Sequence, residues 1–275
     1  MHRHHDDEVH EHDRGLSHDL PVLARRRMIR LLAGASLVPL VGCTSDEGTS
    51  ASSSSSSSSS AASSGECATI PNETAGPYPG DGSNGVNVLK ESGVVRSDIT
   101  KSFGDSAGGT AEGVPLTVTL TVVDAASGCG TPKKGAAVYL WHADRDGKYS
   151  LYSDGVTDEN YLRGVQETDD QGQVTFKSVF PGCYDGRWPH IHFEVYGSLA
   201  DATAATSITN TSQLAFPKDT CEEVYSAEGY SQSVTNLDRV SLETDNIFSD
   251  GYGRQLAAMK GGATEGYTAS LTVPV

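Results

Sequence analysis

Alternation of apolar and polar residues is the feature that most constrains the fold of this 275-residue chain. In the run PLTVTLTVVDA (115–125) every second residue from Leu116 to Val122 is a leucine or valine. Successive side chains of a strand point to opposite faces, so these residues line one face. Four further runs are strand-like: AAVYLWHAD (136–144), QVTFKSVF (173–180), HIHFEVYG (190–197) and ASLTVPV (269–275). Glycine- and proline-rich turns separate the runs, and the pattern predicts an all-β fold, an antiparallel β-sandwich.

Helical sequence is scarce in the chain. The best short candidates are DTCEEVYSAEGY (219–230) and YGRQLAAMKG (252–261). No glycine-rich phosphate loop and no sustained amphipathic stretch is present, so we expect only a few short helices around the sheets.

The N-terminal quarter is predicted to be an export signal followed by a flexible linker. Residues 1–42 contain RRRMIR, which resembles a twin-arginine export signal, and then a short apolar stretch that ends in LVGC. We interpret residues 1–42 as a lipoprotein signal peptide and Cys43 as the lipidated residue, although a plain secretory signal remains an alternative. Residues 43–66 are rich in serine and predict a flexible linker, because they cannot bury a core. The folded domain is therefore expected at 67–275, exported and then lipid-anchored at the outer face of the membrane or secreted.

The charge balance excludes one class of partner. The formal net charge is −16, and residues 1–42 contribute six acidic and six basic residues, so the acidity belongs to the remaining chain. An acidic surface repels phosphates, which argues against nucleic acid as a partner. We expect the protein to contact the membrane only through a lipid on Cys43. The oligomeric state is not specified by the sequence.

Four cysteines lie beyond residue 66. An even number in an exported protein favours two disulfides, and sequence alone leaves three pairings open. We favour the pairs Cys67–Cys129 and Cys183–Cys221. A thiolate zinc site is disfavoured because no two of these cysteines are closely spaced.

Two histidines one residue apart stand in an otherwise apolar strand. His190 and His192 share the face opposite Ile191 and Phe193. Tyr184 precedes them across the turn PGCYDGRWP, and another turn, DRDGKYS, presents Tyr149. Two imidazoles with two phenolates form a harder ligand set than the thiolate and imidazole sets of zinc, and they suit Fe(III).

These motifs together resemble the intradiol ring-cleaving dioxygenases, the family of protocatechuate 3,4-dioxygenase and catechol 1,2-dioxygenase. The similar segments are TIPNETAGPYPG, AAVYLWHADRDGKYS, NYLRGVQETDDQGQVTFKSVFPGCYDGRWPHIHF, TSQLAFP and DNIFSDG. The likeness is strongest to exported single-domain members, and it implies the β-sandwich of that family.

The resemblance also implies roles for individual residues. It makes Tyr149, Tyr184, His190 and His192 the ligands of one non-haem Fe(III) per chain, with Tyr184 and His192 axial. Arg187 would stabilise charge on the bound aromatic ring, and Gln213 matches an active-site glutamine. Tyr184 would leave the iron as a catechol binds, and O2 would then cleave the ring to a muconate-type diacid.

Two departures from the family pattern concern the substrate. The stretch from Tyr184 to His190 is short, and GSLADATAATSITN (197–210) resembles an insertion. Both predict an open site that accepts larger or varied catechols. We expect structural roles for the nearby His142, Tyr152 and Tyr161.

Three functions follow from these patterns. The chain is an exported iron dioxygenase for catechols, or a degenerate member that binds aromatic or polymeric material at the cell surface. The third alternative is a copper or zinc protein that uses the histidine pair alone. Neither a carboxylate pair typical of glycosidases nor a serine nucleophile motif stands out.

Overall fold

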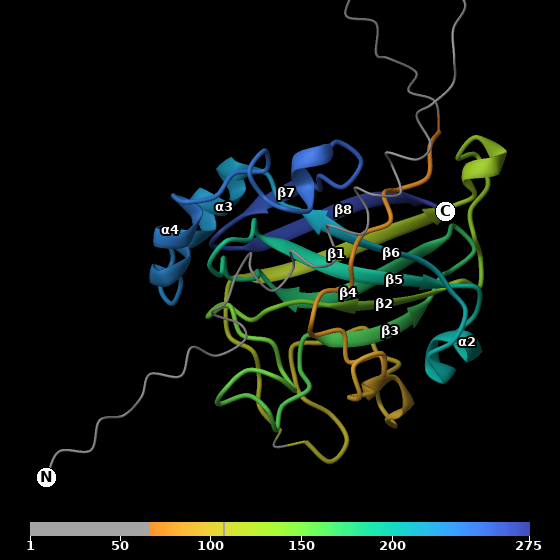
Figure 1. The fold of residues 1–275 in the computed structure, drawn as a ribbon, viewed down its shortest axis with the longest axis horizontal. Coiled ribbons are helices and arrows are strands. Elements are labelled where there is room, and N and C mark those ends of the chain that lie inside the picture. The colour runs from red at the N-terminus through yellow and green to blue at the C-terminus, as the bar shows by residue number, and fades with distance from the viewer. Residues whose placement is uncertain (1–66, 107) are drawn as a thin grey trace, which may run out of the picture. The chain divides into compact units, whose positions relative to one another are not determined.

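The computed structural model describes residues 67–106 and 108–275, and within them two four-stranded sheets pack face to face (Figure 1). The strand orders are β4-β1-β8-β7 and β3-β2-β5-β6. All neighbouring strands are antiparallel except β1 and β8, which run parallel. The strands are β1 (Pro115–Val123), β2 (Ala137–Trp141), β3 (Arg163–Glu167), β4 (Gln173–Val179), β5 (His190–Tyr196), β6 (Ile208–Ala215), β7 (Ala258–Gly262) and β8 (Gly266–Pro274). The predicted all-β sandwich is confirmed, with one parallel pair added.

The core between the sheets follows the alternation in the sequence. Leu116, Val118, Leu120 and Val122 of β1 are all buried, with at most 1% of their surface exposed. The inward-facing Ile191 and Phe193 of β5 belong to the same cluster. The two sheets face each other because these side chains are buried between them.

Among the described residues helices are few and short, as predicted. They are α2 (Leu199–Ala204), α3 (Lys218–Tyr225) and α4 (Ser231–Leu237), with single 3-10 turns η2 (Val88–Lys90), η3 (Ala125–Ser127) and η4 (Phe248–Asp250). The helix expected at 219–230 forms over its first part, as α3. The stretch 197–210 holds α2 and the start of β6. No helix of the described ranges is long and apolar enough to cross a membrane.

The helix predicted at 252–261 is wrong. Its second half is the edge strand β7, which pairs with β8 from Ala258 opposite Ser270 to Gly262 opposite Gly266. The adjacent glycines Gly261 and Gly262 disfavour a helix, and Gly261 has a φ of 114°. Pairing with β8 therefore overrides the helix propensity of the preceding residues.

One of the two predicted disulfides forms. Cys67 and Cys129 are bonded, with their Cα atoms 5.6 Å apart. The predicted Cys183–Cys221 pair is wrong, because both residues are buried free thiols. The Cys183 thiol donates instead to the carbonyl oxygen of Arg187 at 3.4 Å, and both cysteines fill the core as small apolar side chains.

The first described segment, residues 67–80, contacts β8 of one sheet and then β6 of the other; we call it the N-terminal strap (orange in Figure 1). Its Ile70 amide donates to Pro274 of β8 at 2.9 Å, and its Glu73 amide donates to Thr211 of β6 at 2.7 Å. The strap thereby joins the two sheets. The predicted signal peptide (1–42) and linker (43–66) lie outside the described residues.

Candidate metal centre

The two histidines stand at the start of β5, on the face turned away from the core between the sheets. Register places Trp141 of β2 and Gln213 of β6 directly opposite His192, one on each side. Opposed residues of antiparallel strands project to the same face. Three neighbouring strands thus present an indole, an imidazole and a carboxamide in one row.

The two tyrosines reach this row from loops. Tyr149 is held by a turn in which its amide donates to Ser153 Oγ at 2.9 Å, and its side chain is 2% exposed. Tyr184 lies on the loop before β5 and is half-buried. Gly147 has a φ of 79°, and a Cβ there would lie 3.0 Å from the Cβ of Tyr184, so this close approach of the two loops favours glycine.

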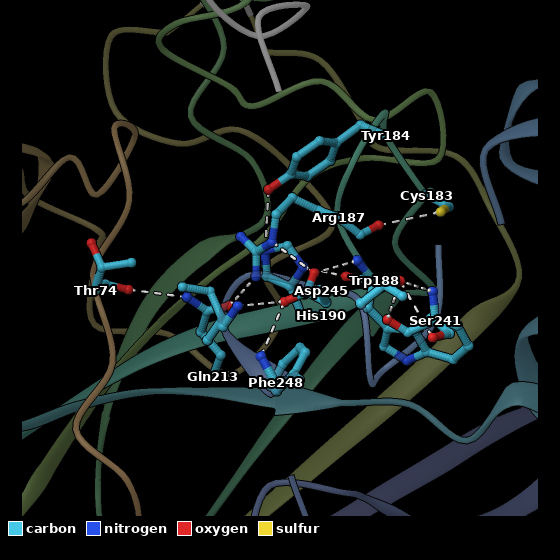
Figure 2. Close-up of polar contacts among 12 residues, drawn as sticks. Thr74, Cys183, Tyr184, Arg187, Trp188, His190, Gln213, Ser241, Asp245 and Phe248 are labelled. Atoms are coloured by element: carbon cyan, nitrogen blue, oxygen red, sulfur yellow. Dashed lines mark hydrogen bonds and ion pairs between the residues drawn. The ribbon is translucent and has the colours of Figure 1, made fainter. Parts of the chain in front are cut away.

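Four donor atoms converge where these side chains meet. Tyr149 Oη lies 3.4 Å from both Tyr184 Oη and His190 Nε2. Tyr184 Oη lies 3.2 Å from His190 Nε2, and the two histidine Nε2 atoms are 3.1 Å apart (Figure 2 shows Tyr184 and His190). The structure therefore brings all four sequence-predicted ligands together, although 43 positions separate the first from the last.

The protonation of His190 follows from its partner. Its Nδ1 lies 2.5 Å from the carbonyl oxygen of Trp188, which can only accept a hydrogen bond, so Nδ1 carries the proton. The lone pair of Nε2 then faces the tyrosines. Burial, reinforced by nearby positive charge on Arg187, lowers the pKa of His190 well below its usual value and keeps the ring neutral.

His192 is oriented by packing. The indole of Trp141 stacks on its ring with centroids 4.9 Å apart and planes 8° apart, and Tyr139 stacks on Trp141 in turn. Among the described residues the Nδ1 atom of His192 is buried without a hydrogen-bond partner. The pKa of His192 is lowered well below its usual value, mainly by burial and next by the neighbouring His190. Both imidazoles are thus neutral and able to donate a lone pair.

Tyr149 carries the opposite shift. Burial and then the neighbouring Tyr184 raise the pKa of the Tyr149 phenol well above its usual value. This shift favours the protonated phenol, and a metal ion at the point of convergence is what would hold it as phenolate.

The chemistry of this donor set fits a single hard cation. Ligand atoms bound at about 2.1 Å to one ion stand roughly 3.0–3.4 Å apart, which is the range of the four distances given above. The described residues contain no cluster of three or more His, Cys, Asp or Glu side chains suited to a metal ion. Any metal held at this point therefore depends on the two tyrosine oxygens as well as the histidine pair.

Arg187 and Gln213 lie together beside this cluster. Arg187 Nη2 donates to Gln213 Oε1 at 2.7 Å, and Gln213 Nε2 donates to the carbonyl oxygen of Thr74 in the N-terminal strap at 3.0 Å. Arg187 Nε donates to the carboxylate of Asp245 at 2.9 Å (Figure 2). Arg187 and Gln213 were predicted from the sequence, whereas Asp245, Thr74 and Trp141 were not.

Comparison with known proteins agrees with this arrangement. Residues 94–226 match the dioxygenase family model described as Dioxygenase_C. An intradiol ring-cleavage dioxygenase from Tetranychus urticae is 29% identical and superposes with a TM-score of 0.55, over 67% of this chain and 87% of that one. A second dioxygenase crystal structure is 28% identical with a TM-score of 0.59, over 76% of this chain and 94% of the other. By these matches the chain is similar to the intradiol ring-cleavage dioxygenases.

A curated relative adds a local match within this family. Chlorocatechol 1,2-dioxygenase from Rhodococcus opacus is 38% identical over 56 residues, which are 20% of this chain. The match spans only 22% of the relative's length. The chain thus shares a short dioxygenase segment with that enzyme.

The dioxygenase segment 94–226 contains all four candidate ligands together with Arg187 and Gln213. Two of the residues missed from the sequence lie outside it: Thr74 precedes the segment and Asp245 follows it. The only signal for Asp245 was its place at the start of DNIFSDG, one of the segments similar to the family.

Three nearby residues occupy structural positions. His142 is buried, with Nε2 2.7 Å from Ser178 Oγ and Nδ1 2.7 Å from the Ala143 carbonyl oxygen. Tyr152 accepts from the Gly80 amide at 2.9 Å, and Tyr161 donates to Asp144 Oδ2 at 3.0 Å. These contacts agree with the structural roles expected for all three.

Proposed function

We propose that residues 67–275 form a non-haem Fe(III) dioxygenase that cleaves catechol-type aromatics with O2 to muconate-type diacids. One iron per chain would be held by Tyr149, Tyr184, His190 and His192. The observation that carries the proposal is the convergence of the donor atoms of Tyr149, Tyr184 and His190 at 3.2–3.4 Å, with His192 Nε2 at 3.1 Å from His190 Nε2, on a fold similar to the intradiol dioxygenases. When bound, Fe(III) would chelate the diol of the substrate and activate its ring toward O2.

The protein supplies the site for proton transfer. Tyr184 is the less enclosed of the two phenols, half-buried where Tyr149 is buried. It is therefore suited to moving away from the centre and taking a proton from a catechol hydroxyl. Tyr149, nearly fully buried and fixed by Ser153, would remain in place.

Arg187 and Gln213 supply electrostatic stabilisation. The Arg187 guanidinium keeps its charge at any physiological pH and presents several N–H donors in a fixed plane. Held by Gln213 beside the cluster, it would stabilise negative charge that develops on the substrate ring during cleavage. The row of Trp141, His192 and Gln213 forms a rigid floor beneath that ring.

Catechol-type substrates are supported by the relatives. The curated match is a chlorocatechol enzyme, and the solved relative from Tetranychus urticae is described as ring-cleaving. The short turn between Tyr184 and His190 leaves less chain to wall the site, so we propose that bulky as well as simple catechols enter.

Export of the protein is a further part of the proposal. The Cys67–Cys129 disulfide is typical of proteins that fold in an oxidising compartment. The twin-arginine-like motif and the LVGC sequence support export with a lipid on Cys43. The enzyme would then act at the outer face of the membrane or in the medium.

The visible spectrum of the iron-loaded protein tests the proposal. Phenolate bound to Fe(III) absorbs visible light, so we expect a coloured protein whose band moves to longer wavelength when catechol is added without oxygen. Tyr149→Phe and Tyr184→Phe should each lose or shift the band and lower catechol-dependent O2 uptake by more than about 100-fold, the upper end for losing a residue that merely supports a metal ligand.

Tyr152→Phe is the matched control, because its hydroxyl contacts Gly80 and Asn84 and not the cluster. It should keep the band and the activity. A colourless protein that binds catechol without consuming O2 would support the binding-module alternative. Metal content unchanged in both tyrosine variants would support a copper or zinc site built on the histidine pair alone.

A further inference from the structure

A buried carboxylate from the C-terminal part of the chain stands behind the candidate site. Asp245 has no exposed surface. Its Oδ2 accepts from Arg187 Nε at 2.9 Å and from the Trp188 amide at 2.7 Å. Its Oδ1 accepts from the amides of Ile247 and Phe248 at 2.8 and 3.1 Å (Figure 2). The two oxygens thus accept four hydrogen bonds from two separate segments.

These bonds fix the Arg187 side chain at two points. Asp245 holds the Nε edge and Gln213 Oε1 holds Nη2. Gln213 is itself oriented, because its Nε2 donates to Thr74 and its backbone pairs with His192. A guanidinium bonded at two edges has little freedom to rotate, so its plane is set before any substrate arrives.

The same carboxylate reaches the histidine ligands through the main chain. Asp245 Oδ2 accepts from the amide of Trp188, and the carbonyl oxygen of Trp188 accepts from His190 Nδ1. One oxygen atom therefore bonds both the cation beside the site and the residue that orients a candidate ligand.

The ion pair between Arg187 and Asp245 is buried, and stability alone does not explain it. The side chains of Arg187 and Asp245 are 5% and 0% exposed, and the desolvation of two buried charges offsets much of their attraction. The charges of Arg187 and Asp245 sum to zero. The effect of Arg187 on a substrate therefore depends on where its N–H groups point. The ion pair therefore fixes the direction of the Arg187 N–H groups and adds no net charge to the site.

We propose that Asp245 is a positioning residue of the dioxygenase site, which acts through Arg187. The proposal rests on the proposed function and adds to the site a segment outside the dioxygenase match at 94–226. The chain around residues 245–248 is accordingly part of the catalytic arrangement, although it lies more than 50 residues beyond the histidine pair in sequence.

A double-mutant cycle tests the proposal. Asp245→Asn should lower kcat/KM for catechol roughly 10- to 100-fold, the range for residues that support a metal site, and it should leave iron content and the resting visible band unchanged. In an Arg187→Met background the same change should cost less than about threefold, because no guanidinium is left to orient and the Asn side-chain oxygen can still accept from the Trp188 amide. Multiplicative losses, or wild-type activity in Asp245→Asn, would overturn the proposal.

Asp245→Glu keeps the inference testable if Asp245→Asn does not fold. It retains the charge and displaces the carboxylate by one methylene, so kcat should fall in the wild-type background and stay unchanged in the Arg187→Met background. Asp98→Asn is the control, because its ion pair with Lys177 at 3.1 Å lies on the other sheet. It should leave kcat/KM unchanged.

A readout without turnover separates this inference from the proposed function. In the metal-free protein, NMR should find the Nε–H proton of Arg187 protected from solvent exchange, and Asp245→Asn should remove that protection while β1 amides stay protected. A wild-type protein that consumes no O2 would contradict the proposed function alone. Unchanged Nε–H protection in Asp245→Asn would contradict the positioning role alone.

Discussion

The two sheets of the sandwich differ in what covers their outer faces. In the sheet β4-β1-β8-β7, burial alternates along β4, with apolar residues inside and Thr175 and Lys177 exposed. In the sheet β3-β2-β5-β6, every residue of β2 and β5 is buried. The N-terminal strap and the loop with Tyr149 lie over this second sheet, through contacts such as Thr74 to Gln213.

This difference shows where a sandwich can hold polar chemistry. A face open to water needs only solvated side chains, and their geometry is free. A covered face must give each polar group a partner or a ligand, which fixes its position. The candidate centre lies on the covered outer face of the second sheet, and the first sheet supplies the core that keeps it rigid.

The largest expected effect sharpens this division of roles. Phe176→Ala removes a fully buried ring from the inner face of β4 and should lower the free energy of unfolding by about 3–5 kcal/mol. Chemical denaturation measures the loss. Iron bound per folded chain should stay the same, and a parallel loss of iron would show that the first sheet also shapes the centre.

A smaller effect is expected on the covered face of the second sheet. Trp141→Phe replaces the indole that stacks on His192 with a smaller ring, and it should lower the free energy of unfolding by about 1 kcal/mol. Iron affinity, measured by competition with a chelator, should fall roughly 10-fold because the imidazole is less well oriented. Unchanged affinity would mean that the stack contributes to packing alone.

The smallest effect is expected on the open face of the first sheet. Thr175→Ala removes one partner of the contact between Thr175 Oγ1 and Thr119 Oγ1, 3.3 Å apart on neighbouring strands. Stability should change by about 0.5 kcal/mol or less, and iron affinity and activity should not change. A loss above about 2 kcal/mol, beyond the usual range for a surface position, would show that this face is not open in solution.

Regular alternation made β1, β4 and β8 of the first sheet and its core predictable from sequence, whereas its edge strand β7 was predicted as a helix. The run from Leu116 to Val122 gave the right strand and the right inner face. β3 and β6 were missed because RGVQE and ITNTSQLA are polar and lack a clear period. They form strands because β2 and β5 offer edges to pair with, which is tertiary information.

The site was predictable where its residues share short motifs. Tyr149, Tyr184, Arg187 and the histidine pair stand in compact turns and one strand, so a family pattern identifies them. Asp245 pairs with Arg187 across 58 positions, and no local pattern marks such a contact. The pairing of Cys183 with Cys221 failed for the same reason, since counting cysteines says nothing about which thiols meet.

If the protein is anchored through Cys43 as proposed, the disulfide has a mechanical consequence. Cys67 is bonded to the loop that follows β1, and the strap leaves from that point toward Thr74 and Gly76 beside the candidate centre. A pull transmitted through the chain ahead of Cys67 therefore enters the sandwich at residue 129, through a covalent bond. The strap is spared that load, and the alignment of Gln213 and His192 is shielded from tension on the tether.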